Sequence, residues 1–444
     1  MKDDTKPGGF SNSCQAQQRR ILHICMLHSS EQDSRSNPVA GVTGLMIGSE
    51  LPISKYYLIP KTIKSFKKIT KILLFMIKNT LSFSQFIHIP IPLVAAIGAA
   101  AVSTASMAAG GGIEFTSQDW QVACDNTRTC RLAGYQAENN SEFPVSVLLV
   151  RRAGANADVD GKIKLGGAKE SSSKALMQLG SRHRISLLIN GRDYGETRPF
   201  SAAAGNAELT ATQVNALLEA LTKTSKIELV LRNSRWQLSD KGASAVMLKA
   251  DEFQGRVGTP SAFIKTEGAA KPNSSVLAPK PAPKLRFVAP NPKAVPSGQR
   301  KFVMRSSQLA ALMKETLKDA DRDCPNLDDK SPWRVSRLNN SQLLAQHDCW
   351  VSAYNAGSGV WVINDKKPYK PTLVTTSATS YDKGKLSSVQ KGRGIGDCIS
   401  QVDWLWTGRA FEKSHESTTG LCRMIEAGGA WQLPTYVTEV KIGK

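Results

Sequence analysis

The stretch Ile185-Ser-Leu-Leu-Ile-Asn-Gly191 decides the fold class of this chain. A short β-type run ends in Asn-Gly, the dipeptide that favours a two-residue hairpin turn between antiparallel strands. Comparable runs recur on both sides, separated by Gly, Asn and Asp, at Trp120–Cys124, Val145–Arg151 and Ile227–Leu231. This pattern predicts a β-rich N-terminal domain over residues 109–265.

Two helices are expected among these strands. Thr210 and Gln213 have the spacing of a capping box at the start of the first helix. For the second helix, Ser239 is expected to cap the start and Gly255 the end, since glycine tolerates the left-handed conformation of a helix C-terminus. The apolar residues at helical spacing are expected in the core: Val214, Leu217, Leu218 and Leu221, then Ala243, Val246, Met247 and Ala250.

A second β-rich domain is expected over residues 302–444. It begins with a helix that Ser306 or Ser307 can cap, with Leu309, Leu312, Met313 and Leu317 on one face. Strands are expected at Trp350–Tyr354, Val360–Ile363, Thr372–Thr376, Val402–Trp406 and Pro434–Val440. The expected fold class is therefore mainly β with a few helices (α+β), arranged as two antiparallel β-sandwich-like domains.

A Pro/Lys-rich segment, residues 266–301, separates the two halves. Proline at this density is not expected to pair in a sheet and favours an extended, semi-rigid backbone. The segment carries seven Lys or Arg residues and one acid, Glu267. We interpret it as an exposed interdomain linker.

Cysteine placement indicates the compartment. Cys14 and Cys25 precede an export signal, and six cysteines follow it. An even number of cysteines after such a signal implies disulfides formed in an oxidising compartment. The expected pairs are Cys124–Cys130, Cys324–Cys349 and Cys398–Cys422. A long gap isolates the first pair, whereas the other four cysteines could also pair across their domain.

The export signal is assigned to residues 76–108. No Lys, Arg, Asp or Glu occurs from Thr80 to Ile113, and small residues at Ser106 and Ala108 suit signal peptidase. Cleavage after Ala108 would make Ala109 the first residue of the mature chain and place the protein in the periplasm or outside the cell. A retained membrane anchor is the alternative, but the apolar run is Ala-rich and interrupted by prolines, so no retained span is expected.

Residues 1–75 lie too far upstream to belong to an ordinary signal peptide. Met76, followed by the basic Lys78, has the position of a translation start. We interpret residues 1–75 as an extension of the gene model, with an unstructured leader as the alternative.

The chain has a formal net charge of +21, most of which falls after residue 108. Such a charge favours anionic partners, here anionic envelope components or another protein. A solvated basic surface that aids solubility is the alternative. Nucleic acid is not expected, because an exported protein rarely meets it and no nucleic-acid-binding motif accompanies the charge.

No catalytic, cofactor or metal motif is recognised. The part after the signal holds three histidines, His183, His347 and His415, and no cysteine pair has zinc-ligand spacing supported by histidine. The run Asp319-x-Asp321-x-Asp323 begins like a calcium loop but continues with Cys324, so solvated acids are the better interpretation. No cofactor is therefore expected.

Two features remain as a candidate ligand surface. The loop Lys391-Gly-Arg-Gly-Ile-Gly-Asp397 lacks the spacing of a phosphate-binding motif, but Lys391 and Arg393 could hold an anion. Trp404 and Trp406 are expected on one face of a strand, where they could stack on a sugar or pack in a core.

Several motifs carry a resemblance. They are Cys349-Trp-Val-Ser-Ala-Tyr-Asn355, Lys391-Gly-Arg-Gly-Ile-Gly-Asp-Cys398, Thr419-Gly-Leu-Cys-Arg423 and Gly428-Gly-Ala-Trp-Gln-Leu-Pro434. Through them, residues 113–441 resemble the exported bacterial family catalogued as domain of unknown function 1176, which implies a periplasmic protein. Asp119-Trp-Gln-Val-Ala-Cys124 and Leu238-Ser-Asp-Lys-Gly-Ala-Ser-Ala-Val246 are similar to the invasion-associated locus B family, which implies a small secreted β-rich domain and a link to host-cell entry.

The function expected from these observations is a non-enzymatic binding or envelope-associated protein in the periplasm. A hydrolase or transferase acting on envelope glycans is the first alternative, with carboxylates that the sequence does not pair. A host-directed invasion-associated factor is the second.

Overall fold

A computed structural model describes residues 106–107, 111–167, 169–177, 182–201, 203–267, 271–290 and 307–443. The predictions for residues 1–75, for most of the signal segment with Ala108 and Ala109, and for linker residues 291–301 lie outside this range. The described residues all belong to one compact unit, residues 97–444. The division of this unit into two domains stays a prediction.

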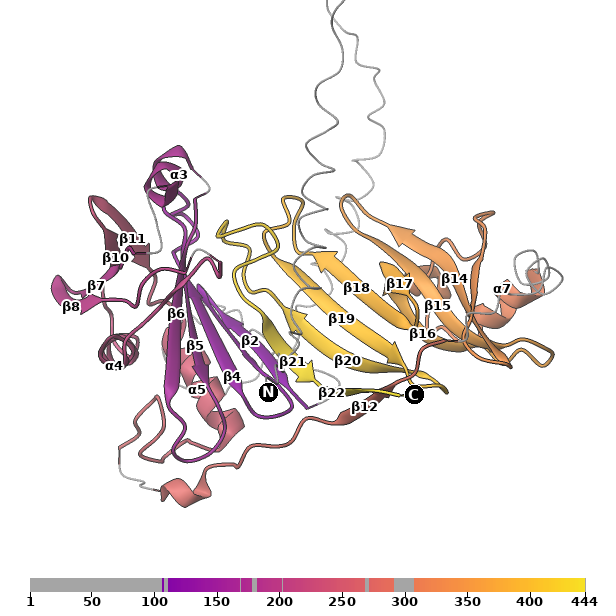
Figure 1. The fold of residues 1–444 in the computed structure, drawn as a ribbon, viewed down its shortest axis with the longest axis horizontal. Helices are drawn as coiled ribbons and strands as arrows, with labels where there is room; N and C mark the ends of the chain where they lie inside the picture. The colour runs from indigo at the N-terminus through magenta and orange to yellow at the C-terminus, as the bar shows by residue number, and fades with distance from the viewer. Residues whose placement is uncertain are drawn as a thin grey trace, which may run out of the picture. The chain divides into compact units, whose positions relative to one another are not determined.

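The N-terminal half contains two antiparallel sheets (Figure 1). The larger has the order β1 (Ser106–Met107), β2 (Ile113–Ser117), β3 (Trp120–Cys124), β4 (Cys130–Tyr135), β5 (Val145–Arg151), β6 (Val159–Leu165), β9 (Ala207–Glu208). The smaller has the order β11 (Ser234–Leu238), β10 (Ile227–Leu231), β7 (Ser186–Ile189), β8 (Arg192–Glu196). The predicted hairpin joins β7 to β8, with φ of 50° at Asn190 and 83° at Gly191, as a turn with two left-handed residues requires.

The N-terminal helices are α3 (Glu170–Met177), α4 (Ala211–Ala220) and α5 (Ala243–Gln254). The capping box of Thr210 and Gln213 is confirmed, and so is the left-handed C-cap at Gly255. The N-cap predicted at Ser239 is wrong, because α5 starts after Gly242. Ser239 is instead held on extended chain, where its N–H donates to Tyr135 O and its carbonyl accepts from Trp120 Nε1.

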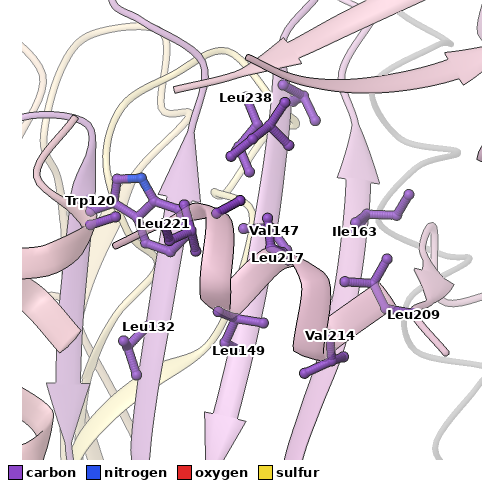
Figure 2. Close-up of a cluster of buried hydrophobic side chains, with 14 of the residues drawn as sticks. Trp120, Leu132, Val147, Leu149, Ile163, Leu209, Val214, Leu217, Leu221 and Leu238 are labelled. Carbon is purple, nitrogen blue, oxygen red and sulfur yellow. The ribbon is translucent and has the colours of Figure 1, made fainter. Parts of the chain in front are cut away.

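The N-terminal core lies between the sheets and the helices (Figure 2). Three of the four positions predicted to be buried on α4 are at most 3% exposed, while Leu218 is half-buried, and the four on α5 are all fully buried. The side chains labelled in Figure 2 come from the larger sheet, from β11 of the smaller sheet, from α4 and from flanking chain: Trp120, Leu132, Val147, Leu149, Ile163, Leu209, Val214, Leu217, Leu221 and Leu238.

The C-terminal half also contains two antiparallel sheets, so the chain is mainly β as predicted (Figure 1). The first sheet consists of β13 (Arg334–Arg337), β14 (Gln342–Val351), β15 (Ala356–Asn364) and β16 (Thr372–Ala378). The second consists of β17 (Ser380–Asp382), β18 (Lys385–Lys391), β19 (Ile399–Trp406), β20 (Phe411–Thr418) and β21 (Leu433–Val437). Two short helices precede them, α7 (Ser307–Lys314) and α8 (Ala320–Asp323).

Two C-terminal strand predictions need correction. The strand expected to run to Tyr354 ends at Val351, because Ser352 N donates to Asn355 O and the chain turns there. The strand expected over Pro434–Val440 is two strands, β21 and β22 (Glu439–Ile442).

Part of the predicted linker is paired in a sheet. Lys284–Phe287 form β12, which runs parallel to β22. The expectation that this segment stays out of sheets is therefore wrong where it lacks proline. Upstream of β12, Leu277 N donates to Gln254 O and Lys280 N donates to Thr127 O, so this part of the segment also lies against the N-terminal half.

None of the helices in the part of the chain described above is long and apolar enough to cross a membrane.

Candidate functional site

Two of the motifs of the C-terminal half lie in neighbouring loops, one between β14 and β15 and one between β18 and β19. We call residues 351–356 the hairpin tip and residues 391–398 the glycine loop. The Asn355 amide joins them, since its Nδ2 donates to Lys391 O at 2.9 Å and its Oδ1 accepts from Lys391 N at 2.8 Å. Tyr354 Oη also donates to Gly392 O at 3.4 Å. The end of β18 is thereby fixed to the β14–β15 hairpin.

A disulfide joins the last residue of the glycine loop, Cys398, to Cys422. All three predicted disulfides are present, Cys124–Cys130, Cys324–Cys349 and Cys398–Cys422. A Cβ at Gly392 would lie only 2.6 Å from Cys398 Sγ and 3.0 Å from Cys422 Sγ, so the chain can pass the third disulfide here only as glycine. The disulfide therefore determines the path of the loop.

Arg393 and Asp397 form a second closure within the loop. Arg393 Nε donates to Asp397 Oδ1 at 2.7 Å, its Nη2 donates to Oδ2, and Met424 N donates to the same carboxylate at 2.7 Å. Burial alone would raise the pKa of Asp397, but these hydrogen bonds and the charge of Arg393 outweigh it and lower the pKa. Arg393, which was predicted to hold an anion, binds Asp397 in this way, while its side chain stays 41% exposed.

Lys391 remains as the cation that the loop presents. It is exposed and makes no ion pair with any residue that the structure describes. Three exposed apolar side chains accompany it on the two tips: Val351 at 74%, Tyr354 at 44% and Ile395 at 62% exposure. A rigid loop with one cation among apolar side chains is suited to contact another molecule.

The two tryptophans of the candidate ligand surface differ in burial. Trp406 is fully buried, with its ring centroid 5.3 Å from that of Phe411, so it packs in the core and offers no face to a ligand. Trp404 is half-buried beside the same cluster, after a bulge between Asp403 and Trp404. The core interpretation therefore holds for Trp406.

Sequence reasoning missed a cleft on the N-terminal half. It has a volume of about 640 Å³ and is lined by charged side chains and by apolar ones that include Leu209 and Val214. The charged residues are Arg152, Asp158, Asp160, Lys162 and Glu208. Pairing of β6 with β9 places Glu208 beside Lys162, whose Nζ lies 3.4 Å from Glu208 Oε1. No sequence motif indicated this group, because four of its members lie within residues 152–162 without a recognised spacing and Glu208 comes from a distant strand.

The fold and the site define a mainly β, disulfide-bonded protein with a rigid, exposed loop. Residues 114–438 match the family described as "Protein of unknown function (DUF1176)", and the chain belongs to this family.

The chain is similar to the uncharacterized protein YpfG of Escherichia coli (strain K12), with 26% identity over 341 residues that cover 70% of this chain and 90% of the relative. A tail fiber of Staphylococcus aureus phage P68 aligns over 73% of this chain and 72% of its own, with 8% identity and a TM-score of 0.11. A score this low supports no structural argument.

Acid is expected to loosen the glycine loop. Because the pKa of Asp397 is lowered in the fold, its stabilisation is complete above the ordinary carboxyl pKa of about 4 and is lost as the pH falls through the folded value. Asp397→Asn should lower the free energy of unfolding by about 1–2 kcal/mol at pH 7 and by less at pH 3. Thermal melts at both pH values check this. Asp382→Asn, at the exposed end of β17, is the control. An equal loss of unfolding free energy in both variants would contradict the claim that Asp397 holds the loop closed.

Proposed function

We propose that this chain is an exported, non-enzymatic protein of the bacterial envelope and that its glycine loop binds an anionic envelope component. The observation that carries the proposal is the rigid loop that exposes Lys391 beside Ile395 and Tyr354. Three disulfides and a formal net charge of +21 support an oxidising compartment and an anionic partner.

Rigidity supports binding because an ordered surface loses little conformational entropy when a partner docks. The loop is held by Cys398–Cys422, by the Arg393–Asp397 pair and by Asn355 of the hairpin tip. These contacts fix the backbone but leave Lys391 and Ile395 exposed. The loop therefore has its binding conformation before the partner docks.

Binding to isolated envelope material should weaken steeply as salt rises, because exposed charges are screened within about 8–10 Å at physiological ionic strength. Lys391→Ala should reduce affinity about five- to tenfold, the loss of one partly desolvated ionic contact. It should leave the melting temperature close to that of the parent, because the side chain is exposed.

Lys366→Ala removes an equally exposed cation outside the site and serves as the control. Salt-independent binding, or equal effects of the two variants, would contradict the role of the loop. Arg393→Ala should reduce both binding and stability, because Arg393 also closes the loop.

Export has its own test. Signal cleavage after Ala108 predicts that the protein recovered from the envelope begins at Ala109, within a residue or two. N-terminal sequencing that finds any of residues 1–75 on that protein would exclude both the cleavage site and the start at Met76.

The cleft on the N-terminal half favours a second candidate, hydrolysis of an envelope glycan. Glycoside hydrolysis uses two carboxylates that face each other across the bond to be broken, and Asp158, Asp160 and Glu208 line one cleft. Turnover of an envelope glycan that survives Lys391→Ala but is abolished by Asp160→Asn would place this function first. Binding without turnover supports the binding protein.

A further inference from the structure

The parallel pair β12–β22 forms a two-stranded ribbon with one apolar face. In its register, Leu285 lies beside Val440 and Phe287 beside Ile442, so these four side chains share a face. Leu285 is 5% exposed, and the body of the protein covers it. Val440 and Ile442, on the outer strand, are 47% and 85% exposed. The ribbon therefore presents an uncovered apolar edge.

Two turns of the second C-terminal sheet lie against this ribbon. Val288 N, just after β12, donates to Trp406 O at 2.9 Å, and Trp406 N donates to Gly384 O at 2.8 Å. Lys385 Nζ lies 5.7 Å from the centre of the Phe287 ring, which belongs to the apolar face. The turn that joins β17 to β18 and the turn that joins β19 to β20 are thereby brought to the apolar edge (Figure 1).

Cations gather around that edge. The two turns carry three exposed basic residues, Lys383, Lys385 and Arg409, and the opposite face of the ribbon carries two more, Lys284 and Arg286. Two exposed acids stand beside them, Asp382 and Glu412, while Lys441 and Glu439 pair with each other at 3.9 Å. Basic residues thus outnumber acids around the apolar edge.

We infer that this surface docks onto an anionic lipid bilayer. Basic residues are attracted to anionic head groups, and exposed apolar side chains such as Ile442 gain by entering the boundary between head groups and acyl chains. A soluble acidic glycan would bind the cations but would not cover the apolar edge. A second copy of the chain would bring two positive ribbons together. The combination of charge and apolar exposure therefore fits a bilayer.

The inference goes beyond the proposed function. It rests on the envelope location but not on the glycine loop, and it assigns the protein a place at a membrane surface. The contact that it describes is peripheral, since it uses the side chains of a two-stranded ribbon and two turns.

Sedimentation of the full chain with vesicles tests the inference. The protein should bind vesicles of phosphatidylglycerol and phosphatidylcholine and should bind pure phosphatidylcholine far more weakly. The triple variant Lys383→Gln, Lys385→Gln, Arg409→Gln should lower the affinity on the order of 100-fold, since each cation near an anionic membrane contributes about fivefold. Ile442→Ser should lower it about five- to tenfold. Both variants should keep the parent's melting temperature, because the altered side chains are exposed.

Met177→Ser is the matched control, because it removes an apolar side chain that is 77% exposed on α3, outside both proposed sites. Its vesicle binding should equal that of the parent, whereas Lys391→Ala affects only the envelope component, so the two proposals can fail separately. Equal binding to both kinds of vesicle, or full binding by the triple variant, would overturn the inference. So would a dimer in solution that Ile442→Ser dissociates, or an effect of Ile442→Ser on vesicle binding no larger than that of Met177→Ser.

Discussion

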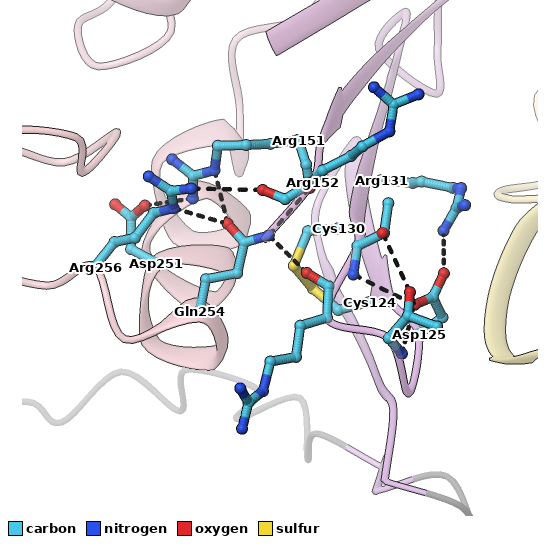
Figure 3. The surroundings of a disulfide bond; sticks show 12 residues. Cys124, Asp125, Cys130, Arg131, Arg151, Arg152, Asp251, Gln254 and Arg256 are labelled. Carbon is cyan, nitrogen blue, oxygen red and sulfur yellow. Dashed lines mark hydrogen bonds and ion pairs between the residues drawn. A yellow bond between two sulfur atoms is a disulfide. The ribbon is translucent and has the colours of Figure 1, made fainter. Parts of the chain in front are cut away.

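Arg151→Ala is expected to lower the free energy of unfolding by about 3–5 kcal/mol, because it leaves the buried carboxylate of Asp251 without its ionic partner. Arg151 is 1% exposed and its Nη2 donates to Asp251 Oδ1 at 2.6 Å, while Nε donates to Gln254 Oε1 at 2.8 Å (Figure 3). The guanidinium also lies 3.4 Å from the centre of the Phe263 ring. Burial lowers the pKa of Arg151 to about 10, although the negative charge of Asp251 acts in the other direction. Arg151 therefore stays protonated at neutral pH.

The neighbouring residue supplies the control for this prediction. Arg152 is exposed, and its side chain makes no ion pair with a residue in the described ranges. Arg152→Ala should therefore change the free energy of unfolding by no more than about 0.5 kcal/mol. Urea unfolding of both variants checks the difference. Similar losses of unfolding free energy in the two variants would mean that the Arg151–Asp251 pair does not stabilise this part of the core.

Replacing both Cys398 and Cys422 by serine is expected to lower the free energy of unfolding by about 3.5 kcal/mol, the loop-closure entropy of a 24-residue separation. Replacing both Cys124 and Cys130, which are six residues apart, by serine should lower the free energy of unfolding by about 2 kcal/mol. Removing the larger bridge should also reduce binding at the glycine loop, because Gly392 packs against its sulfurs.

Unfolding in denaturant and the envelope-binding assay measure the two effects together. A larger loss from the six-residue bridge would contradict the entropic account of these disulfides. Unaltered binding after removal of Cys398–Cys422 would contradict the claim that the bridge holds the loop in its binding conformation.

Local signals in the sequence predicted local structure well. The Asn190-Gly191 turn and the Thr210 capping box depend on residues within a few positions of each other, and both are confirmed. The N-cap at Ser239 failed because distant groups, Tyr135 O and the indole of Trp120, hold that residue on extended chain. Tertiary contacts thus overrode a local preference.

The candidate site was only partly predictable for the same reason. The glycine pattern identified the loop, and Lys391 is exposed there as the anion-binding prediction requires. The sequence does not show that Asn355 brackets Lys391, since this depends on how two hairpins meet. It also gives no sign that β12 pairs with β22, about 150 residues later in the chain.

The most direct test of the central claim is a photo-crosslinking amino acid placed at Ile395 in living cells. Ile395 is 62% exposed on the glycine loop, and Met177, 77% exposed on α3, is the matched position outside it. Our account predicts that position 395 crosslinks to an anionic envelope component, that Lys391→Ala suppresses this product, and that position 177 gives none. No product at position 395, or the same product from both positions, would contradict the assignment of the glycine loop as the binding site.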